Sequence, residues 1–313
     1  MDGGTAIITV TQGDWQYLKE WIEYHRNIGV DMFFIGYNGP KELYPRLPQD
    51  DYVKYYDYAT DDKDPKREYM YLGGNRKAFS GWVGENDPET SMCIMQQIEN
   101  QLFREILYFY KFIKYVCVID TDEFLDIYTE DKDITTFLSK NLPDKNSSIT
   151  IQMRFYGDNG KIYNDTTKGV IERFPKPLER TPVIWNAGFG KMIINMWHWD
   201  VQNGQIRLLS PHSCSKKLNN FILDPEKIEL RHYWTKSLEE WIMKLSSKID
   251  KDYANRFGNT VFSTFFKWNM YTLKKLQAIP RLLKKYDIWY NPLNEDKDFA
   301  YRYAKANNLE FKP

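Results

Sequence analysis

Hydrophobic and polar positions along the first 40 residues follow a strand period and a helix period in turn. Residues 5–10 form an apolar, β-branched run, which predicts a strand that ends at Thr11. Residues 15–28 carry apolar side chains at helical spacing, and Gly29 provides a stop. Residues 32–35 form a second apolar run. Strand, helix and strand within about 35 residues predict a right-handed crossover between two parallel strands.

The same alternation continues as far as residue 125. Residues 52–58 predict a third strand, residues 59–88 a long polar surface loop, and residues 89–110 a long helix. Residues 112–125 begin as an almost continuous apolar run and end abruptly in acidic residues. Such a run is typical of a buried central strand in a parallel sheet.

Beyond residue 125 the pattern changes. Residues 148–155 predict a strand, and residues 160–235 mix short strands and turns, as expected for an antiparallel extension. Four further segments are predicted to be helical: residues 134–142, 238–257, 264–276 and 296–307. We therefore predict an α/β protein with a mixed, mainly parallel sheet flanked by helices, and a C-terminal helical extension.

The acidic end of the apolar run carries the clearest chemical signal. Asp120 and Asp122 are spaced i, i+2, which on an extended chain points both carboxylates to the same side. Ligands of open α/β sheets bind beyond the carboxyl ends of the strands, so these acids are expected where a substrate lies. Together they suit one hard divalent cation held against a diphosphate. The alternative is that they are ordinary loop or helix-capping residues.

Composition narrows the classes of partner. The 313 residues contain 43 acidic and 43 basic side chains, so no basic excess marks a surface for nucleic acid. Three widely spaced cysteines fit a reducing compartment and neither a disulfide framework nor a zinc cluster. No apolar segment reaches about 18 residues. We expect a soluble cytoplasmic protein without a membrane span, with peripheral recruitment left open and the oligomeric state undetermined.

Four stretches, in this order, resemble the boxes of one known family. Residues 14–30 resemble N-E-x-x-Y-L-x-E-W-x-x-Y-H-x-x-x-G-V, and residues 120–125 resemble D-x-D-E-F. Residues 154–160 are similar to F-G-x-x-G, and residues 231–241 to H-Y-x-x-K-S-x-E-E-F. These boxes belong to the family 92 glycosyltransferases and their family 2-like relatives. The resemblance covers about three quarters of the chain, residues 5–245.

The resemblance implies a GT-A type, Rossmann-like catalytic domain at residues 1–240, with residues 241–313 as the helical extension packed on it. It implies a glycosyltransferase that moves a hexose or pentose from a nucleotide sugar, with a UDP-sugar favoured. The acceptor would be a hydroxyl of a glycan or glycoconjugate, and the cofactor Mn²⁺ or Mg²⁺.

Carried over position by position, the family's nucleotide contacts fall on three residues. Thr11 and Asp14 would contact the base and ribose at the end of the first strand, and Asn38 belongs to the second turn. Asp14 stands where the family usually has Glu, and Tyr37 precedes Asn38 where relatives often carry Asp. These departures leave the identity of the base open.

Metal and phosphate contacts are expected from five residues. Asp122 would bind the cation directly, and Asp120 through water or by holding the ribose. His232 follows an apolar alternation that places it at a strand end, and its imidazole suits Mn²⁺; the alternative is a core histidine. Lys236 and Arg76 are candidates to contact the diphosphate, with solvated surface cations as the alternative.

A general base is required if the transfer inverts the anomeric centre. Asp158, in a turn flanked by glycines, is expected to be exposed and is the first candidate, and Glu239 and Glu240 are further candidates. The alternatives are a turn-forming aspartate and an acid that favours the start of a helix. A retaining transfer needs no such base.

Two other classes remain. A sugar nucleotidyltransferase shares a related architecture, but it normally has a cationic, glycine-rich loop after the first strand, and residues 11–14 contain no cation. A non-catalytic carbohydrate-binding protein of the same fold would bind sugar without nucleotide or metal.

Overall fold

The computed structural model describes ten stretches of the chain, which divide into two compact units. The first unit comprises Met1–Arg154 and Thr181–His232, and the second comprises Phe155–Arg180 and Tyr233–Pro313. The described stretches are residues 3–11, 15–37, 47–57, 94–142, 147–178, 190–196, 208–210, 213–214, 219–246 and 261–310.

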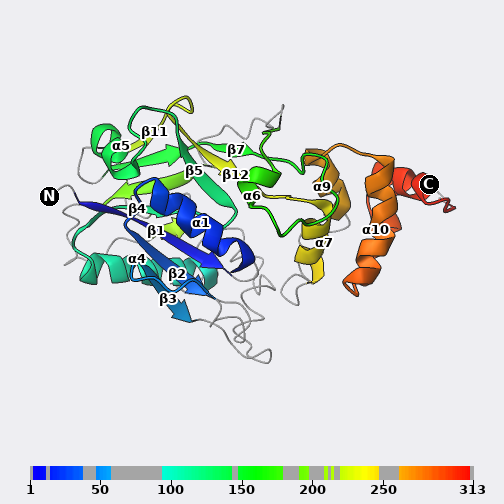
Figure 1. The fold of residues 1–313 in the computed structure, drawn as a ribbon, viewed down its shortest axis with the longest axis horizontal. Helices are drawn as coiled ribbons and strands as arrows, with labels where there is room; N and C mark the ends of the chain where they lie inside the picture. Colours follow the sequence, from blue (N-terminus) through cyan, green and yellow to red (C-terminus); the bar gives the residue numbers. More distant parts are fainter. Residues whose placement is uncertain are drawn as a thin grey trace, which may run out of the picture. The chain divides into compact units, whose positions relative to one another are not determined.

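The parallel half of a seven-stranded sheet forms the centre of the first unit (Figure 1). It contains β1 (Gly4–Thr11), β2 (Met32–Tyr37), β3 (Val53–Asp57) and β4 (Ile113–Val118). β1 pairs in parallel with β2 on one side and with β4 on the other, and β3 extends the sheet beyond β2. The strand order is therefore β3-β2-β1-β4 in this half of the sheet.

An antiparallel strand joins this half to the rest of the sheet. β8 (Lys191–Asn195) pairs antiparallel with β4 on one side and with β6 (Ser147–Ile151) on the other. β11 (Asn219–Ile222) then pairs in parallel with β6 at the edge. β9 (Leu208–Ser210) and β10 (Ser213–Cys214) form a separate antiparallel pair.

Helices cover both faces of the central strands because side chains alternate between the two faces along each strand. Phe34 belongs to a core cluster with the buried face of α4 (Ile94–Phe109). Its neighbour Phe33 points to the opposite face, where its ring contacts Trp21 of α1 (Trp15–Asn27). On that face α5 (Ile134–Asn141) is also tied to β1, through a hydrogen bond between its Thr135 and Thr5.

A three-stranded sheet stands beside the main one, in the order β5-β12-β7. β5 (Glu123–Ile127) and β12 (Ile228–His232) are antiparallel, with Glu123 directly opposite His232. β7 (Met153–Phe155) lies on the other side of β12. β5 follows β4 after a tight turn, which places the acidic residues between two strands.

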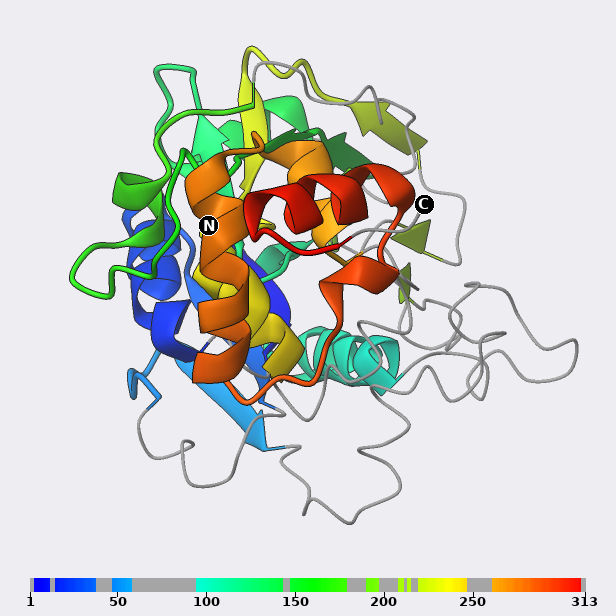
Figure 2. The ribbon, with the colours of Figure 1, turned by 90° about the vertical axis from the view of Figure 1, so that its right-hand side faces the viewer.

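The second unit is mainly helical, and its C-terminal helices lie close together in both views (Figures 1 and 2). Its core is an aromatic and aliphatic cluster that includes Trp241, Phe265, Ile279 and Phe299. The elements are α6 (Val170–Arg173), α7 (Leu238–Ser246), α9 (Val261–Trp268), α10 (Leu273–Lys285), the 3₁₀ helix η3 (Pro292–Asn294) and α11 (Lys297–Ala306).

The predicted α/β class with a mixed, mostly parallel sheet is confirmed, and several segments differ in detail. Residues 112–125 hold two strands and a turn, and residues 148–155 are split between β6 and β7. The predicted helix 264–276 spans the end of α9, a break and the start of α10. None of the helices that the structure describes has both the length and the apolar character needed to cross a bilayer.

The division of the chain also differs from the predicted boundary at residue 240. The first unit ends at His232, and the second takes in residues 155–180 as well as the C-terminal helices. Hydrogen bonds explain why residues 155–180 belong to the second unit. The Leu238 and Glu239 N–H groups donate to the carbonyls of Lys161 and Ile162. Residues 155–180 therefore belong with the start of α7.

Candidate functional site

The carboxyl ends of β1 and β4 form a topological switch point. The chain leaves β1 toward β2 on one side and later returns through α4 to β4 on the other side. Ligands of open α/β sheets bind in the crevice at such a point. Thr11, the last residue of β1, is buried there, opposite Tyr37 at the end of β2.

A hydrogen-bonded turn carries the acidic residues at this edge. The Glu123 N–H donates to the Asp120 carbonyl at 3.0 Å, and the Asp120 N–H donates to the Glu123 carboxylate at 2.8 Å. The expectation that Asp120 and Asp122 share one side of an extended chain is therefore wrong. The turn directs the two carboxylates to different partners.

Asp122 and His232 come together across the small sheet. The His232 Nε2 atom lies 3.5 Å from the Asp122 Oδ1 atom, and the two side chains are 14% and 11% exposed. The antiparallel pairing of β5 with β12 explains this approach, because it places His232 opposite Glu123, next to Asp122. The structure thus brings together two of the three predicted metal ligands.

Asp120, the third predicted ligand, pairs instead with Lys191. The Lys191 Nζ atom lies 2.7 Å from the Asp120 carboxylate and 3.3 Å from the Glu123 carboxylate. The antiparallel direction of β8 brings its first residue, Lys191, to the carboxyl end of β4. Burial by itself lowers the pKa of Lys191, but the charges of Asp120 and Glu123 outweigh that effect and raise it.

Two buried glutamates complete the group. Burial raises the pKa of Glu123 to about 7 and that of Glu99, on α4, to about 8, although Lys191 acts in the opposite direction on both. Within the described residues, no hydrogen bond reaches the Glu99 Oε2 or the Glu123 Oε1 atom. Glu99, Glu123 and Lys191 have no role predicted from the sequence. The available signals were a glutamate in the apolar pattern of α4 and a lysine that opens the apolar run of β8.

The acidic side chains and His232 could supply some of the ligands of a divalent cation. The Asp120 and Glu123 carboxylates contact the Lys191 ammonium group, and the Asp122 carboxylate faces His232. In the described part of the chain, no three His, Cys, Asp or Glu side chains converge as a complete metal site. Asp122 and His232 would hold the cation, since Mg²⁺ and similar ions commonly take only one or two protein ligands and complete their shell with phosphates and waters.

Three side chains of α1 hold the strand that follows the acidic turn. Trp21 Nε1–H donates to the Glu123 carbonyl at 2.8 Å, and the Tyr24 hydroxyl donates to the Leu125 carbonyl at 2.8 Å. The Leu125 N–H donates to His25 Nε2 at 3.2 Å. β5 is an edge strand whose outer backbone groups need partners. The spacing Trp21, Tyr24 and His25 in the first box therefore has a structural explanation.

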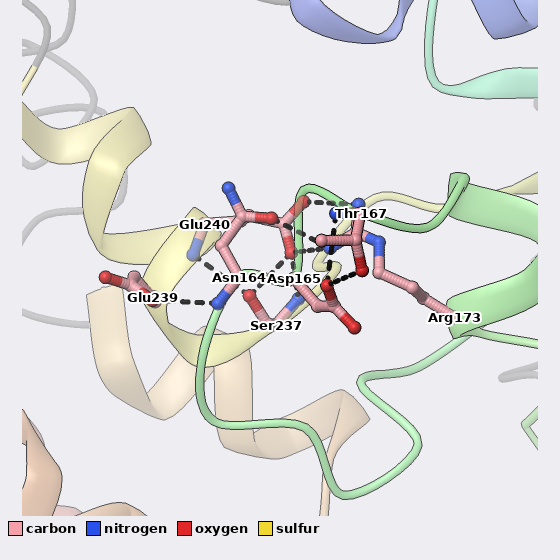
Figure 3. A network of polar contacts seen from close by, with 7 residues as sticks. All are labelled: Asn164, Asp165, Thr167, Arg173, Ser237, Glu239 and Glu240. Atoms are coloured by element: carbon pink, nitrogen blue, oxygen red, sulfur yellow. Dashed lines mark hydrogen bonds and ion pairs between the residues drawn. The ribbon is translucent and has the colours of Figure 1, made fainter.

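Lys236 lies in the second unit, at the start of α7, where it is buried and has φ +50°. Its burial contradicts the alternative of a solvated surface cation, while the expected diphosphate contact stays a prediction. Ser237 and Glu240 form a capping box: the Glu240 N–H donates to the Ser237 hydroxyl at 3.2 Å, and the Ser237 N–H to the Glu240 carboxylate at 3.1 Å. Glu240 also forms a buried bidentate ion pair with Arg173, at 2.8 and 2.9 Å (Figure 3).

Glu239 has the contacts of a structural acid. Its carboxylate accepts the Asn164 N–H at 2.7 Å, Lys285 Nζ at 2.6 Å and the Tyr286 hydroxyl at 2.8 Å. Figure 3 shows it directed toward Asn164. Although burial alone would raise the pKa of Glu239, these donors lower it. They favour the alternative in which Glu239 stabilises the start of α7.

Asp158 is buried, and the expectation that its turn exposes it is wrong. Its carboxylate accepts the Gly160 N–H at 2.9 Å and forms an ion pair with buried Lys275. Its own N–H donates to the Asn269 side chain at 2.6 Å. Burial raises the pKa of Asp158, with Lys275 acting in the opposite direction. These contacts favour the turn-forming alternative over the general base.

Asp14 and Asn38, which were predicted to contact the nucleotide, and Arg76, which was predicted to contact the diphosphate, lie outside the described residues, as does the predicted polar loop at residues 59–88. No known family model matches the chain. A comparison with curated proteins also finds no match.

Proposed function

We propose that this chain is a metal-dependent glycosyltransferase of the GT-A type, which transfers a sugar from a nucleotide sugar, UDP-sugars being favoured, to a hydroxyl of a glycan acceptor. One observation carries the proposal. An aspartate and a histidine approach to 3.5 Å at the switch point of a mostly parallel sheet, inside a group of acids that exceeds its cations.

Three of the four boxes add support, because residues in them meet at the acidic turn. The D-x-D-E-F box forms the acidic turn, the first box holds the following strand from α1, and His232 of the fourth box faces Asp122. Residues far apart in sequence thus converge on one turn.

The proposed chemistry assigns separate tasks to this chain's residues. Asp122 and His232 would hold Mn²⁺ or Mg²⁺, which when bound offsets the charge that gathers on the departing diphosphate. Thr11, buried at the end of β1, would contact the nucleoside of the donor. Trp21, Tyr24 and His25 keep β5, and so the acidic turn, in place.

A donor-hydrolysis screen tests the proposal, because many transferases slowly hydrolyse their donor when no acceptor is present. The protein is incubated with Mn²⁺ and a panel of nucleotide sugars, and release of nucleoside diphosphate is measured. We expect one UDP-sugar to be hydrolysed, and the activity to be lost with a chelator and in Asp122→Asn.

The matched control is Asp131→Asn. Asp131 carries the same charge and, among the described residues, pairs with Lys140 at the surface, so its loss should cost less than about 1 kcal/mol of stability and leave hydrolysis intact. Full hydrolysis in Asp122→Asn would remove the metal assignment. Formation of a nucleotide sugar from a sugar phosphate would indicate a nucleotidyltransferase, and sugar binding without nucleotide or metal would indicate a carbohydrate-binding protein.

A further inference from the structure

Lys191 contacts two carboxylates, although one buried carboxylate would be enough to compensate its buried charge. Its side chain is 3% exposed, so its ammonium group needs a buried partner, and fully buried Glu123 at 3.3 Å provides one. Yet the shorter contact, 2.7 Å, is to Asp120, whose side chain is 39% exposed and could be solvated by water.

Asp120 also lies two residues before Asp122, in the turn that its own N–H closes by donating to the Glu123 carboxylate. A carboxylate that pairs with an ammonium group is less available to a metal ion, since both compete for the same oxygens. A lysine is suited to yield such a contact, because its long stem is flexible and its three donors are not fixed in one plane. When a divalent cation takes Asp120, Lys191 retains Glu123.

We propose that Lys191 is a built-in counter-ion that competes with the divalent cation for Asp120. It sets the resting metal affinity below what the acidic turn would otherwise give. This inference rests on the proposed function for its biological meaning, but its test needs neither a donor nor turnover.

The test is a titration with Mn²⁺ alone, followed by the loss of the free-ion electron paramagnetic resonance signal. The informative variant is Lys191→Met with Glu123→Gln, which neutralises the buried pair together and leaves Asp120 charged. We expect it to bind Mn²⁺ about 10- to 100-fold more tightly than the natural protein, the usual range for partners of metal ligands. Adding Asp120→Asn should abolish that gain, whereas Asp120→Asn alone should change affinity by less than about threefold, because Lys191 already occupies this carboxylate.

Thermal unfolding of each variant checks that it is folded. If the double variant does not fold, Lys191→Gln keeps a hydrogen-bond donor for Glu123 and carries the same prediction. The inference is overturned if removing the ammonium group leaves Mn²⁺ affinity unchanged, or if Asp120→Asn weakens binding equally in both backgrounds.

The two failures are distinguishable. Coupled Mn²⁺ affinities without hydrolysis of any nucleotide sugar would support the role of Lys191 and contradict the transferase. Hydrolysis that depends on Asp122, together with Mn²⁺ affinities in which the effects of Asp120 and Lys191 are independent, would support the transferase and contradict the role of Lys191. An absence of Mn²⁺ binding in every variant, with and without UDP, would contradict both.

Discussion

Lowering the pH should reduce the stability of the first unit, because His25 is buried there in its neutral form. Its ring is fully buried, its Nδ1 atom lies 2.8 Å from the Trp21 carbonyl, and its Nε2 atom accepts the Leu125 N–H. A carbonyl accepts and an N–H donates, so the proton must be on Nδ1. A second proton on Nε2 would point at a donor and would charge a ring stacked on Phe124.

The size of the effect follows from the two pKa values. Burial lowers the pKa of His25 from 6.5 to about 3, against the opposing effect of its hydrogen bond to Trp21. Between these values the unfolded chain binds a proton that the folded chain does not, so stability is complete above pH 6.5 and falls as the pH drops. At about 1.4 kcal/mol per unit, the loss reaches about 2.7 kcal/mol near pH 4.5.

The assay is urea unfolding at several pH values, with His25→Gln as the matched variant. Glutamine can donate to the Trp21 carbonyl and accept from Leu125, but it does not titrate. The difference in unfolding free energy between the two proteins should therefore be constant above pH 6.5 and shift against the natural protein below it. Parallel pH curves for the two proteins would refute the reasoning, because His25 would then carry no proton difference.

Three further substitutions test the structure. Trp21→Phe removes the donor to the Glu123 carbonyl and should cost about 1–3 kcal/mol in unfolding measurements; an unchanged stability would contradict the role of α1 in holding β5. Arg173→Met leaves the buried charge of Glu240 uncompensated and should cost about 3–5 kcal/mol, most of which Glu240→Gln should restore in the double variant. Asp158→Asn should lower the melting temperature while sugar transfer changes by less than about threefold; a loss of about 10²-fold in folded protein would reinstate Asp158 as the general base.

The early part of the fold was predictable because its signals are local. β1, α1, β2, β3 and β4 all appear where periodicity predicts them, within two or three residues. The turn before β5 was missed because it depends on the side chain of Glu123 accepting a backbone N–H, which no hydrophobic period reveals.

The C-terminal helices were harder to delimit. Pro280 lies inside α10, where the missing N–H normally ends a helix, and the predicted helix stopped at residue 276. The structure continues the helix to Lys285 because Ile279, Leu282 and Leu283 bury one apolar face in the core of the second unit. Packing outweighs local propensity there.

Those residues of the candidate site that lie at the ends of strands were predictable from the sequence. His232 was expected to leave a strand near the acids, and the pairing of β12 with β5 places it beside Asp122. Lys191 was not predictable, since its position depends on β8 inserting antiparallel between β4 and β6, a long-range pairing without a sequence signal. Asp158 was misjudged for the same reason, because Asn269 and Lys275 bury it from more than 100 residues away.

The most direct test of the central claim is a pulsed electron paramagnetic resonance measurement of Mn²⁺ bound in the presence of UDP. Coordination by His232 predicts a nitrogen coupling from the imidazole, present in the natural protein and absent in His232→Gln. A nitrogen coupling that persists in His232→Gln, or a bound Mn²⁺ that shows none, would contradict the assignment of Asp122 and His232 as the cation site.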